Sequence, residues 1–311
     1  MVAFTGCRRE PLPDAGNAIR FSVGPEVLVE MQTKATLPSE TDFQGLPIAL
    51  YGISTKGGSS QVLFDGSTNL TYKDGEWSYS PTKYWNQGAA YNFRAVSPAG
   101  AIIADGSAST ESGKVEANYG DYDLMVASNH EITSLASTSS VAPVSLSFSH
   151  AGSAVSFGFR KGANESRNCY VTSFKVDGIC SVGTMTYSWS ADDKKDVITP
   201  AADASSKTTV WSWSESTEET PWSLTADYQY FDGWHLAVPQ TLAGAKVHFT
   251  YKFEDETQER SATLSIPNAT WQPGMVYKYQ IDITVFTLGL DFTIQPWPTD
   301  DETITGTHTF H

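Results

Sequence analysis

The side chains that could do chemistry are few and scattered in this sequence. Its six histidines show neither an HExxH pattern nor a close spacing with cysteine, so the usual signs of a zinc site are missing. Acidic residues at Asp121 and Asp123, and again at Asp300 and Asp301, could contact Ca²⁺, but neither group extends into a calcium-binding loop. We therefore expect no metal and no cofactor.

Sequence motifs of catalysis are missing as well. The chain has no GxSxG nucleophile elbow, no GxxxxGK[ST] phosphate loop and no GxGxxG after a strand. The two carboxylates of a glycosidase can converge from distant positions, so a sequence with 35 Asp and Glu residues leaves that arrangement open. We expect a protein that is not an enzyme.

One cysteine stands where a covalent modification would be expected. The segment Phe4-Thr5-Gly6-Cys7 resembles a bacterial lipobox, in which small residues precede a lipid-acceptor cysteine. A lipid on Cys7, followed by the polar tether 8–17, would hold the protein at a membrane surface without spanning the membrane. A chance cysteine in a disordered terminus is the alternative.

The other two cysteines are expected to be small buried side chains. If Asp177-Gly178 closes a two-residue hairpin, Cys180 lies opposite Lys175 and Cys169 lies opposite Thr186, so the two cysteines do not pair. A longer turn leaves a disulfide between them open.

Composition narrows the class of protein. With 20 Lys and Arg against 35 Asp and Glu, the net charge is −15, which repels nucleic acid and anionic lipid headgroups. Charged residues make up only 18% and aromatic residues reach 12%, a balance that favours β-strands over helices. No run approaches the length of about 18 apolar residues that a bilayer span requires. The chain is typical of a secreted, all-β protein.

The elements that position these residues are predicted to be strands. Short segments of two-residue hydrophobic alternation, bounded by Gly, Pro, Asp and Asn, recur along the chain, and no amphipathic helical period persists. This pattern predicts two tandem Greek-key β-sandwich domains, divided within the Ser/Thr/Ala-rich stretch 128–142. The expected parts are a leader remnant and tether at 1–17, an N-terminal domain at 18–142, a C-terminal domain at 143–298 and a tail at 299–311.

A polar segment from Ala191 to Pro221 is predicted to be a long loop. Loops of this length are usually functional or disordered, and we expect disorder or an excursion at a sheet edge rather than a ligand site. Trp211 and Trp213 lie near its end. They are the candidates in an alternative interpretation, in which the chain is a surface-anchored glycan-binding lipoprotein whose exposed tryptophans stack on sugar rings.

The most regular alternation of the chain lies near its start, in the segment 18–31. Its odd positions carry the apolar side chains of a strand with one buried face. These residues are Ile19, Phe21, Val23, Val27, Val29 and Met31. A lone basic residue, Lys34, follows at once, where a trypsin-like protease would cut before Ala35. The alternative is a permanent first strand followed by a solvated lysine.

Several segments, taken in order, resemble the fimbrillin-like proteins of Bacteroides-type bacteria, which are lipoprotein precursors of fimbrial subunits. FSHAGSAVSF and TWQPGMVYKYQI are the most specific of them, and together the segments cover about residues 7 to 297. The others are Cys7, AIRFSV with QTKAT and DFQGLPIALYGI, YNFRAVSP, DYDLMVAS, SFKVDGICSVGTM and LDFTIQPW. The resemblance implies two transthyretin-like β-sandwich domains, export as an outer-membrane lipoprotein precursor, and polymerisation or tip placement at the cell surface with other fimbrial subunits.

The resemblance also implies an assembly mechanism. In that family the first strand is removed by a trypsin-like protease and a strand from another subunit fills the groove. The matching site here is Lys34-Ala35, whereas Arg20 lies inside the strand. Many members carry arginine at this place, so a protease specific for arginine would leave this chain uncut.

A donor strand must also alternate and be able to leave its own domain. Two segments of the C-terminal part have such a pattern. The first carries Leu288, Leu290, Phe292 and Ile294; the second carries Ile304 and Phe310. The chain is thus predicted to be a structural or adhesive subunit of a cell-surface fimbria, with a ligand on a host or bacterial surface as a further partner.

Overall fold

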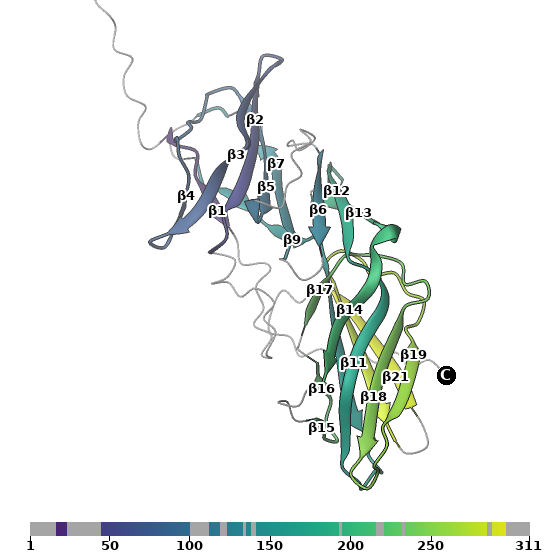
Figure 1. Cartoon of the computed structure of the whole chain (residues 1–311). Helices are drawn as coiled ribbons and strands as arrows, with labels where there is room; N and C mark the ends of the chain where they lie inside the picture. Colours follow the sequence, from purple (N-terminus) through teal and green to yellow (C-terminus); the bar gives the residue numbers. More distant parts are fainter. Residues whose placement is uncertain are drawn as a thin grey trace, which may run out of the picture.

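The computed structural model of the chain describes residues 17–23, 45–99, 112–118, 123–132, 135–137, 141–192, 195–215, 221–231, 234–284 and 288–296 (Figure 1). Nearly all of this part is β-structure, which confirms the predicted fold class. Several residues singled out in the sequence lie outside the described part. They include Cys7, Val27, Val29, Met31, Lys34, Ala35, Asp121, Asp300, Asp301, Ile304 and Phe310.

A six-stranded antiparallel sheet dominates the upper part of Figure 1. Glycines with positive φ, Gly57 at 58° and Gly58 at 80°, make the tight turn between its two longest strands. In spatial order it contains β4 (Glu76–Ser78), β3 (Ser59–Lys73), β2 (Ile48–Lys56), β5 (Ala90–Ser97), β7 (Met125–Ile132) and β9 (Phe148–His150).

A short two-stranded parallel sheet covers the inner face of this large sheet. It pairs β1 (Phe21–Val23) with β8 (Val144–Leu146). Apolar side chains from both layers form one buried cluster, which includes Ile19, Phe21, Ile48, Leu50, Phe64, Leu70, Trp85, Tyr91, Phe93, Val144 and Leu146. The first strand of the chain is therefore part of a core.

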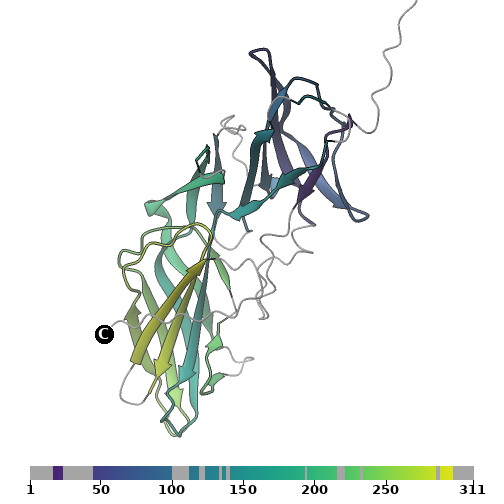
Figure 2. The same ribbon diagram turned by 180° about the vertical axis from the view of Figure 1, so that it is seen from behind.

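Two further sheets pack face to face in the lower part of the molecule, as the view from behind makes clear (Figure 2). One contains β16 (Gln229–Tyr230), β10 (Ser153–Lys161), β20 (Met275–Ile283) and β21 (Leu288–Pro296), with β17 (His235–Ala237) also on β10. The other contains β14 (Lys207–Ser214), β11 (Cys169–Cys180), β18 (Lys246–Phe253) and β19 (Arg260–Ser265), with β15 (Trp222–Leu224) on β11. Phe157, Phe174 and Trp271 are buried between them.

A three-stranded sheet joins the two parts. It contains β13 (Lys195–Ala202), β12 (Val182–Ser190) and β6 (Ser112–Asn118). Met185 and Tyr187 of β12 are buried in a cluster with Tyr51, Val96 and other apolar residues of the six-stranded sheet. The β12–β13 hairpin is thus packed on the outer face of that sheet.

Strand pairings cross the predicted domain boundary at residues 142 and 143. β8 and β9, which follow it, pair with β1 and β7, and β6, which precedes it, pairs with β12. The division into two domains at this point stays a prediction.

Two sequence predictions of local structure are wrong. The segment 191–221 is not a long loop, because it contains β13, a short 3₁₀ turn (Ala204–Ser206) and β14, two strands that lie at sheet edges. The many Ser and Thr residues of these two strands weaken the hydrophobic alternation by which strands are predicted from sequence. Asp177-Gly178 does not close a hairpin either: β11 runs straight through it, and Gly178, with φ of 82°, lies at a bulge opposite β14.

The cysteines behave as expected of buried residues. Cys169 and Cys180 are free and lie at opposite ends of the twelve-residue strand β11, so they cannot bridge to each other. Burial raises the pKa of the Cys169 thiol to about 12.

Candidate functional site

The segment 17–23 occupies a groove between two backbone edges. On one side it pairs with the segment 83–85: the Ile19 amide donates to the Lys83 carbonyl at 2.9 Å, and the Trp85 amide donates to the Asn17 carbonyl at 3.0 Å. On the other side β1 runs parallel to β8, and the Val144 amide donates to the Arg20 carbonyl at 2.7 Å. We call this space, bounded by 83–85 and β8, the β1 groove.

The inward side chains of the segment complete the core beneath it. Ile19 is 1% exposed and Phe21 is 6% exposed, while Val23 is partly buried against the same cluster. The Phe21 ring meets Phe64, Tyr79 and Phe93 edge-on, with centroid distances of 5.9, 5.7 and 5.3 Å. Edge-on contacts of this kind add to the free energy of burial. The three described residues of the predicted removable set are therefore brought together in one buried row.

The side chain of Tyr79 holds the segment 17–23 by a hydrogen bond. Its hydroxyl donates to the Ile19 carbonyl at 2.8 Å and accepts from the Lys83 amide at 3.3 Å. Burial raises the pKa of this phenol, so it keeps its proton at physiological pH. One hydroxyl of Tyr79 thereby links the first strand, at Ile19, to the groove edge, at Lys83. No sequence pattern indicated this role.

Departure of this segment would expose apolar surface and break backbone pairings. Burying Ile19 and Phe21 stabilises the fold by about 3–6 kcal/mol, at about 1.5–3 kcal/mol for each large apolar side chain. The Val144 amide and the Lys83 carbonyl would lose their backbone partners. Unpaired strand edges of this kind readily accept another strand.

One candidate donor, β21, is held in its own sheet. It pairs with β20 along all nine of its residues, from Leu288 to Pro296. Phe292 is buried and its ring stacks on Tyr279 at 5.6 Å, whereas Ile294 is 41% exposed. Within the described part of the chain, β20 is its only strand partner, so β21 is an edge strand.

An ion pair that the sequence did not reveal joins the six-stranded sheet to the three-stranded sheet. Arg94 of β5 is fully buried and its Nη2 lies 2.5 Å from Oδ1 of Asp196 on β13. The Arg94 Nε donates to Ser128 Oγ at 2.9 Å, and the Ser128 hydroxyl donates to Asp196 at 2.6 Å. The Tyr187 ring covers the guanidinium at 4.6 Å. Arg94 and Asp196 are 102 residues apart, so only the fold brings them together.

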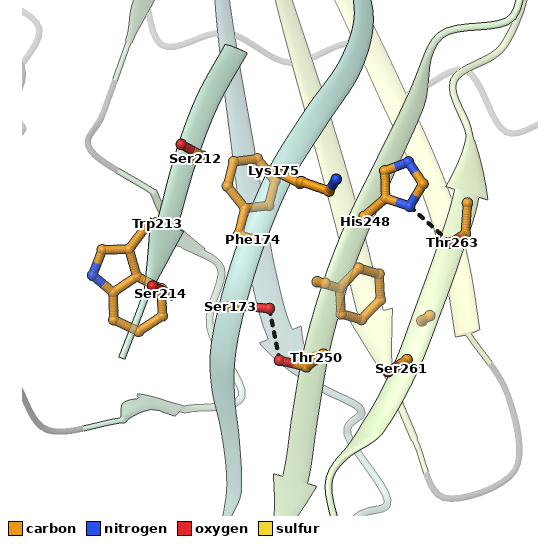
Figure 3. Close-up of a pocket in the computed structure, with 12 residues that line it drawn as sticks. Ser173, Phe174, Lys175, Ser212, Trp213, Ser214, His248, Thr250, Ser261 and Thr263 are labelled. Carbon is orange, nitrogen blue, oxygen red and sulfur yellow. Dashed lines mark hydrogen bonds between the residues drawn. The ribbon is translucent and has the colours of Figure 1, made fainter. Parts of the chain in front are cut away.

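The two tryptophans of the glycan-binding alternative have different places. Trp211 is 9% exposed and stacks on His235, so its faces are not available to a sugar. Trp213 borders a shallow groove of about 460 Å³ on the sheet β14-β11-β18-β19 (Figure 3). It lies opposite the buried Phe174 in the strand register, however, and its side chain packs against the same core cluster. Small hydroxyl side chains make up half of the residues that line this groove: Ser173, Ser212, Ser214, Thr250, Ser261 and Thr263.

His248 lies at the centre of a polar network in this surface groove. Its Nε2 is 2.8 Å from Asp177 Oδ2. Its Nδ1 is 3.0 Å from Thr263 Oγ1, as Figure 3 shows. The Thr209 hydroxyl, followed by the charges of Lys175 and His248, holds the pKa of Asp177 below its usual value. The network offers donors and acceptors to a polar ligand.

The described residues show no cluster of three or more His, Cys, Asp or Glu side chains that could hold a metal ion. The Nδ1 of His150 lies 2.7 Å from Asp123 Oδ2, and both side chains are buried. No helix in the ranges that the structure covers is long and apolar enough to cross a membrane.

Comparison with known proteins gives a consistent result. The sequence profile of the fimbrillin-like family matches residues 33–297, which confirms the resemblance seen in the sequence. Among solved structures, a fimbrial protein from Bacteroides vulgatus is similar with a TM-score of 0.56 and 14% identity, over 91% of this chain and 100% of that one. A candidate cell adhesion protein from Bacteroides uniformis gives a TM-score of 0.55 and 14% identity, over 91% and 99%. Among curated proteins none matches.

Proposed function

The chain belongs to the fimbrillin-like family, and from this membership we propose that it is a structural or adhesive fimbrial subunit whose first strand is a temporary occupant of the β1 groove. Removal of the first strand opens the groove, and a strand from another subunit fills it. Other fimbrial subunits are accordingly the principal partners, and the chain performs no catalysis.

The observation that carries this proposal is the position of the segment 17–23 between two separate edges. Its backbone pairs with 83–85 on one side and with β8 on the other, and its side chains close the core. An occupant held in this way can be replaced by any strand that repeats its hydrogen bonds and its buried side chains. Because the emptied groove exposes several rings at once, refilling it is strongly favoured.

Maturation by two covalent steps is part of the proposal. A lipid on Cys7 would deliver the precursor to the outer membrane, and cleavage between Lys34 and Ala35 would release the first strand. Both steps rest on the sequence patterns and on the family, and they fit a first strand that lies upstream of the family match, which begins at residue 33.

Protein taken from the cell surface tests this proposal. Subunits isolated from fimbriae should begin at Ala35, and they should run as ladders of oligomers in gels without boiling. A Lys34→Ala precursor should stay monomeric with the first strand in place, whereas a control change of Lys56, on an exposed part of β2, should have no effect. Assembly of the Lys34→Ala chain into ladders would refute cleavage at this site.

A second candidate function is favoured by the surface groove that Figure 3 shows. Its hydroxyl side chains, Lys175 and His248 are groups that could bind a polyhydroxylated ligand such as a glycan. Binding on a glycan array that is lost in His248→Ala, and kept in the exposed-site control Tyr84→Ala, would support it. An array without any bound glycan would remove this candidate.

A further inference from the structure

The β1 groove has a chemical requirement that can be read from its present occupant. Ile19, Phe21 and Val23 point inward at every second position, so the groove takes an aliphatic, an aromatic and an aliphatic side chain in that order. The intervening Arg20 and Ser22 are exposed and impose no such condition. The direction is fixed as well, because β1 runs parallel to β8.

The central position is the most selective of the three. Phe64, Tyr79 and Phe93 surround the Phe21 ring from three sides, each edge-on. A side chain without a ring would leave these three rings facing a cavity, and cavities in a packed core are costly. A replacing strand must therefore bring an aromatic residue to this place, two residues after an aliphatic one.

Residues 299–311 of this chain do not meet the requirement. The sequence of this segment places Ile304, Gly306, His308 and Phe310 on one face of a strand. Thr, Asp and His occupy the other face. No two apolar residues in the segment are two positions apart, in either chain direction. Phe310 in the Phe21 place would put His308 in the fully buried Ile19 place.

The strand β21 has the right pattern but is already in use. Leu290, Phe292 and Ile294 repeat the order of aliphatic, aromatic and aliphatic residues in the same chain direction. However, β21 pairs with β20 over nine residues and buries Phe292 against Tyr279. If β21 left one chain to fill the β1 groove of another, it would leave a gap beside β20 in the chain that donated it. A second copy of this chain is therefore a poor source of the replacing strand.

We infer that the natural occupant of the β1 groove is a strand of a different subunit, one that carries an aliphatic–x–aromatic–x–aliphatic pattern and runs parallel to β8. This inference rests on the proposed function, because it presupposes that the first strand leaves. It means that this chain accepts a strand from an unlike neighbour rather than forming a homopolymer. Its own residues 299–311 are then suited only to a groove of different chemistry.

Peptide exchange on the full chain tests the inference. The chain is cut after Lys34 with a lysine-specific protease, and labelled peptides compete with the bound first strand. The peptides are residues 17–34, the same peptide with Phe21→Ala or with Arg20→Ala, and residues 299–311. The peptide 17–34 and its Arg20→Ala form should bind equally well. The Phe21→Ala form should bind at least roughly 100-fold more weakly than peptide 17–34. Residues 299–311 should not displace the first strand.

Two results would overturn the inference, and only one of them would also refute the proposed function. Binding of residues 299–311, or of the Phe21→Ala peptide, as tight as that of peptide 17–34 would refute the selectivity and leave strand exchange intact. Failure of every peptide, including 17–34, to enter the cut protein would refute the exchange itself and with it the proposed function.

Discussion

Phe21 of the first strand meets Phe93 of β5 edge-on, with ring centroids 5.3 Å apart and ring planes at 90°. β5 is an interior strand of the six-stranded sheet, so this contact ties a segment at the start of the chain to the middle of a core. The proposed assembly depends on a strand that is buried in a core and yet precedes Lys34, the lysine at which cleavage is proposed.

Replacing Phe21 with alanine should lower the free energy of unfolding by about 3–5 kcal/mol, because it leaves a cavity among three aromatic rings. Urea denaturation of the uncut chain measures this. The neighbouring Arg20→Ala should change stability by less than about 0.5 kcal/mol, since its side chain is exposed. Equal effects of the two substitutions would contradict the described burial of Phe21.

Removing the Tyr79 hydroxyl should weaken the hold on the first strand. Tyr79→Phe keeps the ring contacts with Phe21 and loses the hydrogen bond to the Ile19 carbonyl, a change worth about 0.5–1.5 kcal/mol. After cleavage at Lys34, the first strand should therefore dissociate faster from Tyr79→Phe than from the wild-type chain. Tyr170→Phe, on β11 and outside the residues that bound the β1 groove, serves as the control and should release the strand at the wild-type rate.

The buried ion pair between Arg94 and Asp196 should be costly to break from one side. Arg94→Met leaves Asp196 without its cation in a site that is 2% exposed, and should destabilise the chain by about 3–5 kcal/mol. Changing both residues, Arg94→Met with Asp196→Leu, should recover much of that loss. A double variant that is less stable than Arg94→Met alone would contradict this account.

The strands themselves could be predicted, and their partners could not. The alternation from Ile19 onward identified a strand with one buried face, since burial on one side imposes a period of two. Nothing in that pattern indicated a parallel partner at Val144, because pairing depends on residues over a hundred positions away. Asp177-Gly178 misled for the same reason: a pair typical of hairpins forms a bulge when neighbours on both sides hold the strand straight.

The candidate site was predictable only in its occupant. Ile19, Phe21 and Val23 announced themselves by spacing, whereas Tyr79 and the edge at 83–85 lie in the alternating segment EWSYSPTKYW, which predicted a strand but not its contact with the first strand. Arg94 and Asp196 likewise gave no signal, because an arginine inside a strand and an aspartate in a polar segment are both common on surfaces.

Acid should weaken the network around His248. The pKa of Asp177 is lowered by the Thr209 hydroxyl and then by Lys175 and His248, so its contribution to stability is present above the unfolded pKa, about 3.9, and is lost as pH falls through the lower folded pKa. Asp177→Asn should therefore be less stable than wild type at pH 6, with the difference shrinking toward pH 2. Denaturation midpoints at both pH values measure it, and a difference that grows in acid would contradict the assignment.

The first residue of the mature protein is the most direct test of the central claim. N-terminal sequencing and intact mass of subunits purified from fimbriae should give Ala35, together with a second chain whose strand lies in the β1 groove. Mature subunits that still begin before Asn17, with Phe21 in its place and no other chain beside β8, would show that the first strand is permanent.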